Sequence, residues 1–301
     1  MFFFPLRALL PLSGRPVLTV VVMIIAVLMF AVQIQNHRQF ERAVLSACDD
    51  LSGFPLQLSF AAMSGDASGA LCPEFLVNVY RSHDPDRAIA ALLAEVLPGD
   101  QPAVQKLRER YQYELSRFYQ HFLMTAPRFI TYDFAYHPES WSFLRAFSSM
   151  FIHQNIYHLL INLVFFFPFS STVERVVGRR TYSLLFIVFV YGSNAVYSAV
   201  SMLFPQALPS IGLSGTVMAF LGTYLVLFPV SRLECILWIL VFFKRFEAPV
   251  WAVGLWVVAW NVGGLWFSGQ HAPVNYTVHL AGILLGLTMG LIIKDKYMPP
   301  K

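Results

Sequence analysis

The chain has 301 residues, of which 57% are hydrophobic and 16% are aromatic, while only 13% carry a charge. This composition excludes an ordinary soluble globule and is typical of a chain that lies largely within lipid. The net charge of +4 comes from basic residues in short clusters between apolar runs, which we interpret as topology signals. We expect no nucleic-acid partner, because the sequence has no basic tract with interleaved aromatic residues and no zinc-finger spacing.

The first apolar run covers residues 16–34 and follows a short segment that carries Arg7 and Arg15. A membrane-spanning helix needs about 20 residues, which this run provides. The alternative is a cleaved signal peptide, whose apolar core would be about 7–15 residues long and followed by a small-residue cleavage site. We therefore predict that residues 1–35 form a cytoplasmic N-terminus and a retained first transmembrane helix.

Residues 36–147 are the only long polar region and are predicted to form an extracytoplasmic helical domain. Asp84-Pro85 is typical of an N-cap followed by the first helical residue, and Pro98-Gly99 is expected to end that helix. A second helix is predicted from about Pro102, because apolar residues then recur at three- and four-residue steps. The domain either packs on itself or on the membrane surface, or it recruits a substrate or partner, and the sequence does not separate these roles.

Two of the three cysteines, Cys48 and Cys72, fall in this polar region. If the region lies outside the cytoplasm, the two residues are expected to form a disulfide; the alternative is a pair of free thiols. The third cysteine, Cys235, has no obvious partner.

Five further apolar runs follow, so that the chain is predicted to hold six transmembrane helices. The later runs are residues 151–169, 182–204, 213–228, 249–267 and 276–293. Such runs must be helices, because lipid offers no partner for backbone polar groups. The apolar stretch 233–246 is short and flanked by charges, and we interpret it as a bent hairpin or a re-entrant segment. The expected fold is an all-α integral membrane bundle with a helical extramembrane insertion between helices 1 and 2.

Basic residues are confined to alternate short loops, which orients the chain. The basic segments are the loop with Arg175, Arg179 and Arg180, the loop with Arg232, Lys244 and Arg245, and the C-terminus with Lys294, Lys296 and Lys301. The loops near 205–211 and 268–275 contain neither Lys nor Arg. Both termini are therefore predicted in the cytoplasm and the polar domain outside. Because the N-terminus is not a Ser- and Arg-rich leader, we expect a bacterial inner membrane.

This topology places polar residues of three helices at the same depth in the outer half of the bilayer. These residues are His153, His158 and Asn162 in the second run, Ser214 at the head of the fourth and His279 in the sixth. Each has an ordinary explanation by itself, such as an interfacial histidine or a hydrogen bond between helices. Ionisable and polar groups within a membrane are nevertheless costly, and a set of them at one depth predicts a functional site.

The chemistry that fits this set is nucleophilic catalysis. A serine hydroxyl is a weak nucleophile until an adjacent base takes its proton, and His279 is the natural base for Ser214. His158 and Asn162 are four residues apart on one helical face, from which they could donate hydrogen bonds to an oxyanion, together with the Ser214 amide. No Asp or Glu occurs at this depth, so we predict a Ser–His dyad without a carboxylate that orients the histidine.

Small residues near these two positions predict close helix contacts. Gly282 and Gly286 follow His279 at steps of three and four, and Gly215 begins a similar stripe after Ser214. Such stripes let helix backbones approach each other in lipid. Gly212 completes the sequence Gly-Leu-Ser-Gly, which is not the nucleophile elbow of soluble hydrolases because residue 216 is Thr.

These motifs together resemble the rhomboid family of intramembrane serine proteases. The resemblance is carried by His153, His158 and Asn162, then Glu174 and Gly178, then Gly212-Leu213-Ser214-Gly215, and then His279 with Gly282 and Gly286. The opening of the fifth apolar run, Ala248-Pro249-Val250-Trp251 with Trp256, is also similar to the family. The resemblance covers about half of the chain, and we assign residues 148–295 to the catalytic core and residues 296–301 to a cytoplasmic tail.

The resemblance implies a six-helix core with a water-filled cavity open to the outside. Ser214 would be the nucleophile, His279 the general base, and His158 and Asn162 parts of the oxyanion hole. His153 would be structural, and Glu174 would pack or form hydrogen bonds near the cytoplasmic side. The implied substrates are single-span transmembrane proteins in the lipid bilayer, no cofactor is implied, and the oligomeric state stays open.

Two departures from the family pattern concern residues close to the site. Many members have Tyr four residues after the serine, stacked on the histidine, where this chain has Met218, and a Met holds a ring less firmly. Leu144-Arg145 stands where the family often has Trp-Arg. The long polar domain is also unusual for the family.

Two functions other than proteolysis would also place polar residues within apolar helices. A transporter would show corresponding polar segments in two halves of the chain, and none is found. A catalytically inactive relative that only binds membrane clients should lack the serine or the histidine, and this chain has both.

Overall fold

The computed structural model describes residues 2–49, 71–82, 84–203, 207–239, 242–268 and 274–298. The chain divides into two compact units, of which the first combines the residues up to Gln33 with those from Asp133 onward. The second unit comprises Ile34–Tyr132. We call them the membrane unit and the helical unit, and we describe each by itself.

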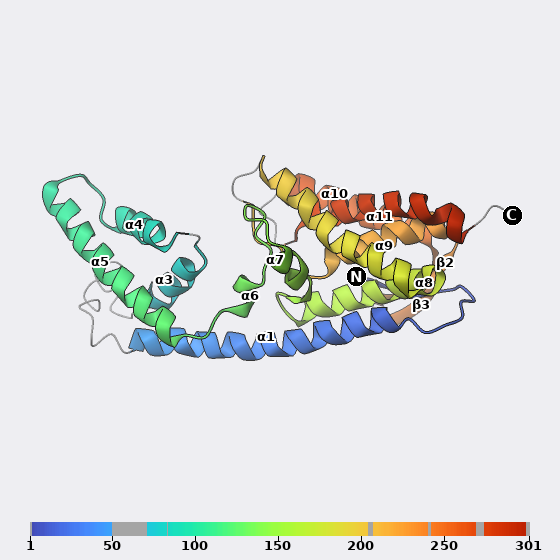
Figure 1. Cartoon of the computed structure of the whole chain (residues 1–301), viewed down its shortest axis with the longest axis horizontal. Helices are drawn as coiled ribbons and strands as arrows, with labels where there is room; N and C mark the ends of the chain where they lie inside the picture. Colours follow the sequence, from blue (N-terminus) through green and yellow to red (C-terminus); the bar gives the residue numbers. More distant parts are fainter. Residues whose placement is uncertain are drawn as a thin grey trace. The chain divides into compact units, whose positions relative to one another are not determined.

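Helices make up most of the described chain. The helices labelled in Figure 1 are, in chain order, α1 (Val17–Asp49), α3 (Leu71–Tyr80), α4 (Pro85–Val96), α5 (Pro102–Thr125), α6 (Ile130–Asp133), α7 (Phe143–Ser148), α8 (Ile156–Ser201), α9 (Ser214–Leu227), α10 (Val250–Ser268) and α11 (Tyr276–Tyr297). A 3₁₀ turn, Ser149–Phe151, follows α7. Within the described residues, α1, α8, α10 and α11 are long and apolar enough to cross a membrane. The chain is therefore a multi-pass integral membrane protein.

Three of the predicted spans after the first differ from the observed helices. The runs at 151–169 and 182–204 fall mostly in one helix, α8, which is interrupted at Gly178, where φ is +75°. Glycine adopts this conformation without steric cost, so the helical path can change direction there. The apolar helix α9 has 14 residues, and at 1.5 Å per residue its length is about 21 Å, which is short of a hydrocarbon core of about 30 Å.

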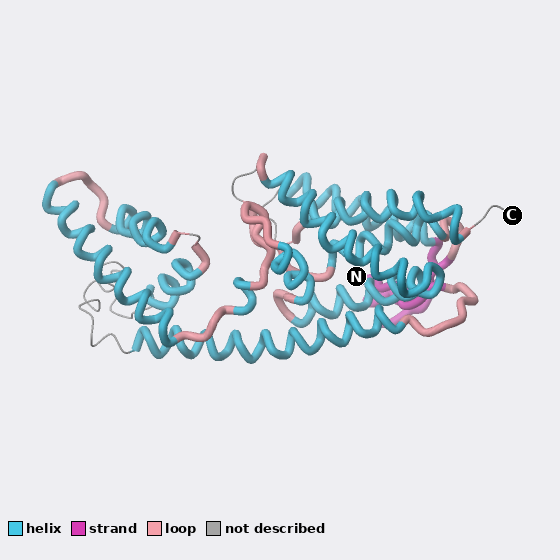
Figure 2. Tube along the Cα trace, in the orientation of Figure 1, coloured by secondary structure: helices cyan, strands magenta, loops and turns pink. Residues whose placement is uncertain are grey.

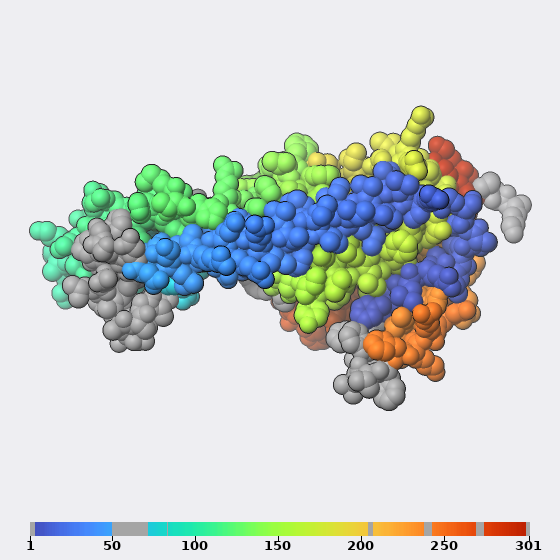
Figure 3. All heavy atoms as spheres, turned by 90° about the horizontal axis from the view of Figure 1, so that it is seen from below, coloured from blue at the N-terminus to red at the C-terminus, as the bar shows by residue number. Residues whose placement is uncertain are grey.

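Helix α1 continues beyond the predicted end of the first span at residue 35. Residues 35–49 contain no proline or glycine and include several good helix formers, so nothing in the sequence ends the helix at the predicted boundary. At the other end, the buried carboxylate of Glu174 accepts hydrogen bonds from the backbone N–H groups of Leu18 and Thr19, each at 2.8 Å. A negative charge at this helix N-terminus is favourable. Figure 3 shows one side of α1 uncovered.

The core of the membrane unit is built from aromatic side chains on α8 and α9. Phe220 of α9 stacks on Tyr182 with ring centroids 5.1 Å apart, and it meets the edge of Phe189 at the same distance. Phe169 and Tyr224 form a further edge-to-face pair. These contacts fix α9 among the longer helices, so that its N-terminus has a defined position.

The expectation of an all-α chain is wrong, because the membrane unit contains a three-stranded antiparallel sheet. The strands β1 (Phe2–Ala8), β2 (Arg232–Ile239) and β3 (Phe242–Pro249) are adjacent in that order, and Figure 2 shows them grouped together. The predicted hairpin at 233–246 therefore exists, in β conformation. Leu233 and Cys235 are buried, while Glu234 between them forms ion pairs with Arg7 and Arg245. A short apolar run does not distinguish strand from helix by its periodicity, which explains the error.

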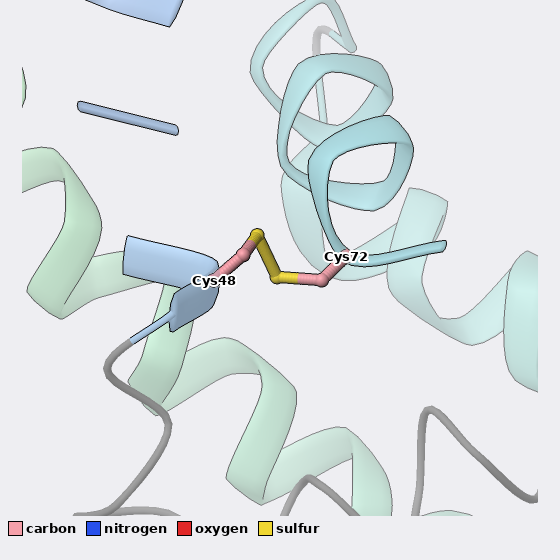
Figure 4. Close-up of a disulfide and its surroundings, with 2 residues drawn as sticks. All are labelled: Cys48 and Cys72. Atoms are coloured by element: carbon pink, nitrogen blue, oxygen red, sulfur yellow. A yellow bond between two sulfur atoms is a disulfide. The ribbon is translucent and has the colours of Figure 1, made fainter. Parts of the chain in front are cut away.

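The helical unit has its own hydrophobic core. Its most deeply buried members are Phe40, Cys72, Leu76, Ile89, Leu93, Leu115, Phe118 and Phe122. The predicted helix after Asp84 is confirmed, with the Asp84 side chain accepting a hydrogen bond from the Arg87 N–H at 3.0 Å, and the predicted helix from Pro102 is confirmed as α5. The structure contains a disulfide between Cys48 of α1 and Cys72 of α3, shown in Figure 4. Cys235 is a free, buried cysteine.

The polar domain was predicted to extend to residue 147, whereas residues 133–147 belong to the membrane unit. The reason is a set of hydrogen bonds to that unit. Tyr136 and Ser210 exchange backbone hydrogen bonds at 2.9 and 2.8 Å. The Asn194 side chain donates to the Ala146 carbonyl at 3.2 Å. This segment therefore anchors the loop that leads into α9.

Candidate active site

Ser214 is the first residue of α9, and its position depends on the turn that precedes it. Gly212 has a φ of +103°, which a residue with a side chain rarely adopts. Its N–H donates to the Ser149 carbonyl at 2.9 Å, which ties the turn to the segment before α8. The hydroxyl of Ser214 is thus placed at a helix N-terminus, next to a backbone that is held in one conformation.

His158 and Asn162, from the first two turns of α8, face this turn. A Cβ atom placed on Gly212 would lie 2.8 Å from His158 Nε2 and 3.5 Å from Asn162 Nδ2. Gly212 is therefore required both by its φ and by the approach of these two side chains. The Asn155 side chain caps α8 by accepting from the His158 N–H at 2.9 Å, and this fixes where the helix starts.

The hydrogen bonds of these two side chains define which atoms can donate. His158 Nδ1 accepts from the Gln154 N–H at 3.4 Å, so the proton of the neutral ring is on Nε2, the atom that faces Gly212. Asn162 Nδ2 donates to the His158 carbonyl at 2.9 Å, and an amide nitrogen carries a second N–H. Both side chains therefore place donor nitrogens close to Gly212, two residues before Ser214, where an oxyanion site would need them.

Helices α9 and α11 approach each other through their glycines. A Cβ atom on Gly215 would lie 2.6 Å from Val278 Cγ1, and one on Gly282 would overlap the carbonyl oxygen of Gly215. Gly286 has the same relation to the carbonyl of Ala219. Because Gly215 follows Ser214 and Val278 precedes His279 in the sequence, the packing brings the two predicted dyad residues to facing turns.

Ser214 and His279 are both partly exposed, and no hydrogen bond joins them. Catalytic hydrogen bonds are often long or poorly aligned before substrate binds, so this geometry is compatible with a nucleophile and its base. The imidazole of His279 has a well-defined partner on its other side. Its Nδ1 lies 2.7 Å from Oδ1 of Asn261, a buried residue of α10.

Asn261 was not singled out in the sequence, although a signal for it existed. It is a polar residue within the apolar segment of α10 and lies in the C-terminal half of that helix. In the predicted topology this half is the outer one, at the depth of Ser214 and His279. A search for polar residues at that depth in every run, including the fifth, would have found it.

The remaining predicted residues lie around this group or away from it. His153 precedes α8, not within it as predicted, and it is fully buried with its ring edge-to-face to His158 at 5.2 Å. The Gln33 side chain holds the His153 backbone by donating to its carbonyl at 2.7 Å and accepting from its N–H at 3.1 Å. Met218 packs on Gly282. Glu174 lies apart from the site and caps α1.

A small polar pocket lies beside the Gly212 turn. Its polar lining residues are Ser149, Ser193, Asn194, Ser210 and Thr216. Within the described part of the chain, no group of three or more His, Cys, Asp or Glu side chains could hold a metal ion. The functional groups of the site are thus hydroxyls, imidazoles and amides.

Three similar proteins of known sequence are all named as rhomboid, rhomboid-related or rhomboid-like proteins. The chain is 26% identical over 177 residues to "Rhomboid protein 1, mitochondrial" of Saccharomyces cerevisiae. The matched region covers 52% of this chain and 48% of that protein. It is 24% identical over 187 residues to human "Rhomboid-related protein 3", covering 58% of this chain and 42% of that protein. It is 27% identical over 143 residues to "Presenilin-associated rhomboid-like protein A, mitochondrial" of Danio rerio, and the match covers 46% of this chain and 34% of that protein.

The chain spans less than half the length of these curated relatives. Two of the three are mitochondrial by name, so the comparison does not support the expectation of a bacterial inner membrane. Residues 140–296, about half of the chain, match the family described as "Rhomboid domain". This family supports intramembrane protease activity in general. The chain therefore belongs to the rhomboid family.

Proposed function

We propose that this protein is an intramembrane serine endopeptidase that cleaves peptide bonds in or near the transmembrane segments of single-span membrane proteins. The observation that carries the proposal is the arrangement at Gly212. There, two N–H donors from α8 face the turn that precedes Ser214, while the glycine contacts of α9 and α11 bring His279 to a facing turn.

The proposed reaction is acyl transfer in two steps. The Ser214 hydroxyl attacks the scissile carbonyl and gives its proton to His279 Nε2, which then protonates the leaving amine. The negative charge on the former carbonyl oxygen is stabilised by His158, Asn162 and the Ser214 backbone N–H. Water then attacks the acyl-enzyme with His279 again as base, which releases the carboxylic acid product and restores the serine.

The proposal includes the membrane topology predicted above. The two parts of α8, on either side of Gly178, would be the second and third spans, and α9 would be a short fourth span that starts in the outer half of the bilayer. Both termini would be cytoplasmic and the helical unit outside. The disulfide of the helical unit supports this orientation, because disulfides persist in oxidising compartments.

The test is cleavage of a model single-span substrate by the purified full-length protein, with Ser214→Ala and His279→Ala beside the wild type. We expect cleavage by the wild type and a loss of at least about 1,000-fold in each variant, as for other residues that act as one catalytic unit. Cleavage that survives in Ser214→Ala would contradict the proposal. A wild type that neither cleaves nor reacts with a serine-directed probe at Ser214 would favour a membrane-client binding role.

A further inference from the structure

The hydrogen bond between Asn261 and His279 has a direction that the surrounding contacts determine. Asn261 Nδ2 donates to the Val257 carbonyl, one turn earlier in α10, at 2.8 Å. This bond fixes the orientation of the amide, so the atom that faces His279 Nδ1 at 2.7 Å is the oxygen Oδ1. An amide oxygen only accepts hydrogen bonds, and the proton in this contact must therefore come from His279.

The consequence is a single tautomer of His279. A neutral imidazole has one N–H, and here that N–H is on Nδ1. The lone pair is then on Nε2, which is the nitrogen that must accept the serine proton. The other tautomer would bring two acceptors, Nδ1 and Oδ1, to 2.7 Å and would leave both without a proton. Asn261 thus selects the form of the ring that can act as a base.

The helix contacts around Asn261 restrict the ring position as well. Gly264 follows Asn261 by nearly one turn of α10, and a Cβ atom on it would overlap the ring of Tyr276. Tyr276 in turn lies edge-on to the His279 ring, at 6.5 Å between centroids and 89° between planes. Helix α10 therefore approaches α11 closely at this level, and its Asn261 side chain, 2% exposed, has little freedom to move.

We propose that Asn261 is the positioning residue of the general base: it orients His279 and fixes its tautomer, so that the site is a Ser–His–Asn arrangement. This inference rests on the proposed protease function. An amide suits the location, since a buried carboxylate in a membrane would add a large desolvation cost.

The first experiment measures the tautomer and does not depend on cleavage. Full-length Ser214→Ala protein with ¹⁵N-labelled histidines is studied by NMR in nanodiscs at neutral pH, and the His279 signals are identified by their loss in His279→Ala. We expect the chemical shifts of a protonated Nδ1 and an unprotonated Nε2, and a mixture of tautomers after Asn261→Leu. A protonated Nε2, or unchanged shifts in Asn261→Leu, would overturn the inference.

The second experiment measures the effect on catalysis. Asn261→Leu should lower kcat about 10- to 100-fold with little change in KM, because misplacing a catalytic group by about 1 Å has effects of this size. Asn261→Asp keeps an acceptor at the same place and should recover part of this loss. Its activity should appear at higher pH than that of the wild type, because a carboxylate stabilises the protonated ring, which cannot act as base.

Val253→Ala is the matched control, because Val253 is buried on the same helix two turns before Asn261. It should lose stability without a change in the pH profile. A wild-type kcat in Asn261→Leu would overturn the catalytic role of Asn261. A wild type without Ser214-dependent cleavage would instead overturn the proposed function, and the NMR result would still decide whether Asn261 fixes the His279 tautomer.

Discussion

The membrane unit and the helical unit differ in how their helices make their closest contacts, although aromatic side chains fill the core of both. In the membrane unit, α9 and α11 meet at glycines, with the Cα atoms of Gly222 and Gly286 against the backbone of the other helix. In the helical unit, the helices meet through large side chains, such as Phe40, which stacks on Phe129 at 4.7 Å and meets the edge of Phe122 at 5.8 Å.

In the proposed topology, the difference follows from the solvent that surrounds each unit, lipid for the membrane unit and water for the helical unit. Lipid tails are as apolar as Leu or Phe, so burying such side chains between two helices in a bilayer gains little, and close backbone contact matters more. In water the burial of aromatic side chains is itself the driving force. A small unit in water still has a limited core, and the helical unit adds the Cys48–Cys72 disulfide. The two units should therefore respond oppositely to a change in side-chain size.

The largest effect is expected where a glycine of the membrane unit receives a side chain. Gly286→Val would place atoms on the carbonyl of Ala219 and separate α9 from α11. Because Ser214 and His279 are on these helices, we expect cleavage of a model substrate to fall by at least about 100-fold, with a lower thermal midpoint by circular dichroism.

The matched control is Gly263→Ala on α10, where a new Cβ would meet no atom within 4 Å. Its stability should stay within about 0.5 kcal/mol of the wild type. If Gly286→Val cleaves as well as this control, backbone proximity is not what holds the site, and the comparison between the units fails.

An intermediate effect is expected when a large side chain of the helical unit is removed. Phe122→Ala would leave a cavity in a core where this side chain is 1% exposed. A loss of about 3–5 kcal/mol is typical of such a change. Hydrogen exchange should show it in α4 and α5, while cleavage of a generic model helix is retained. An equal loss of protection in α9 and α11 would show that the units do not differ as described.

A smaller effect is expected from removing the disulfide. The double variant Cys48→Ser/Cys72→Ser opens a loop with a sequence separation of 24. The helical unit should lose about 2–4 kcal/mol. Calorimetry with and without reductant provides the measurement, since reduction of the wild type should reproduce the variant. Ready labelling of both cysteines by a thiol reagent in the untreated protein would contradict the presence of the bridge.

Much of the fold could be predicted because strong local signals specify it. An Asp followed by Pro before a helical pattern of apolar residues is a typical helix start, and Asp84 and Pro85 are the observed N-cap and first residue of α4. The apolar runs predicted helices near their observed positions. The sheet was missed, because the apolar run of β2 gains its strand identity from pairing with β1, which is more than 200 residues away in the sequence. The length of α1 was missed because the predicted end came from bilayer thickness, which does not terminate a helix.

The sequence by itself determined the chemical groups of the candidate site and predicted a common depth for them, because the positions of polar residues within apolar runs follow from counting residues along each run. Only the tertiary structure decided how these groups meet. Gly212 faces His158 and Asn162 because a left-handed turn brings distant segments together. The contact between Asn261 and His279 depends on the crossing of α10 and α11, which is set by which side chains are small enough to allow close approach. Local sequence patterns do not encode such a crossing.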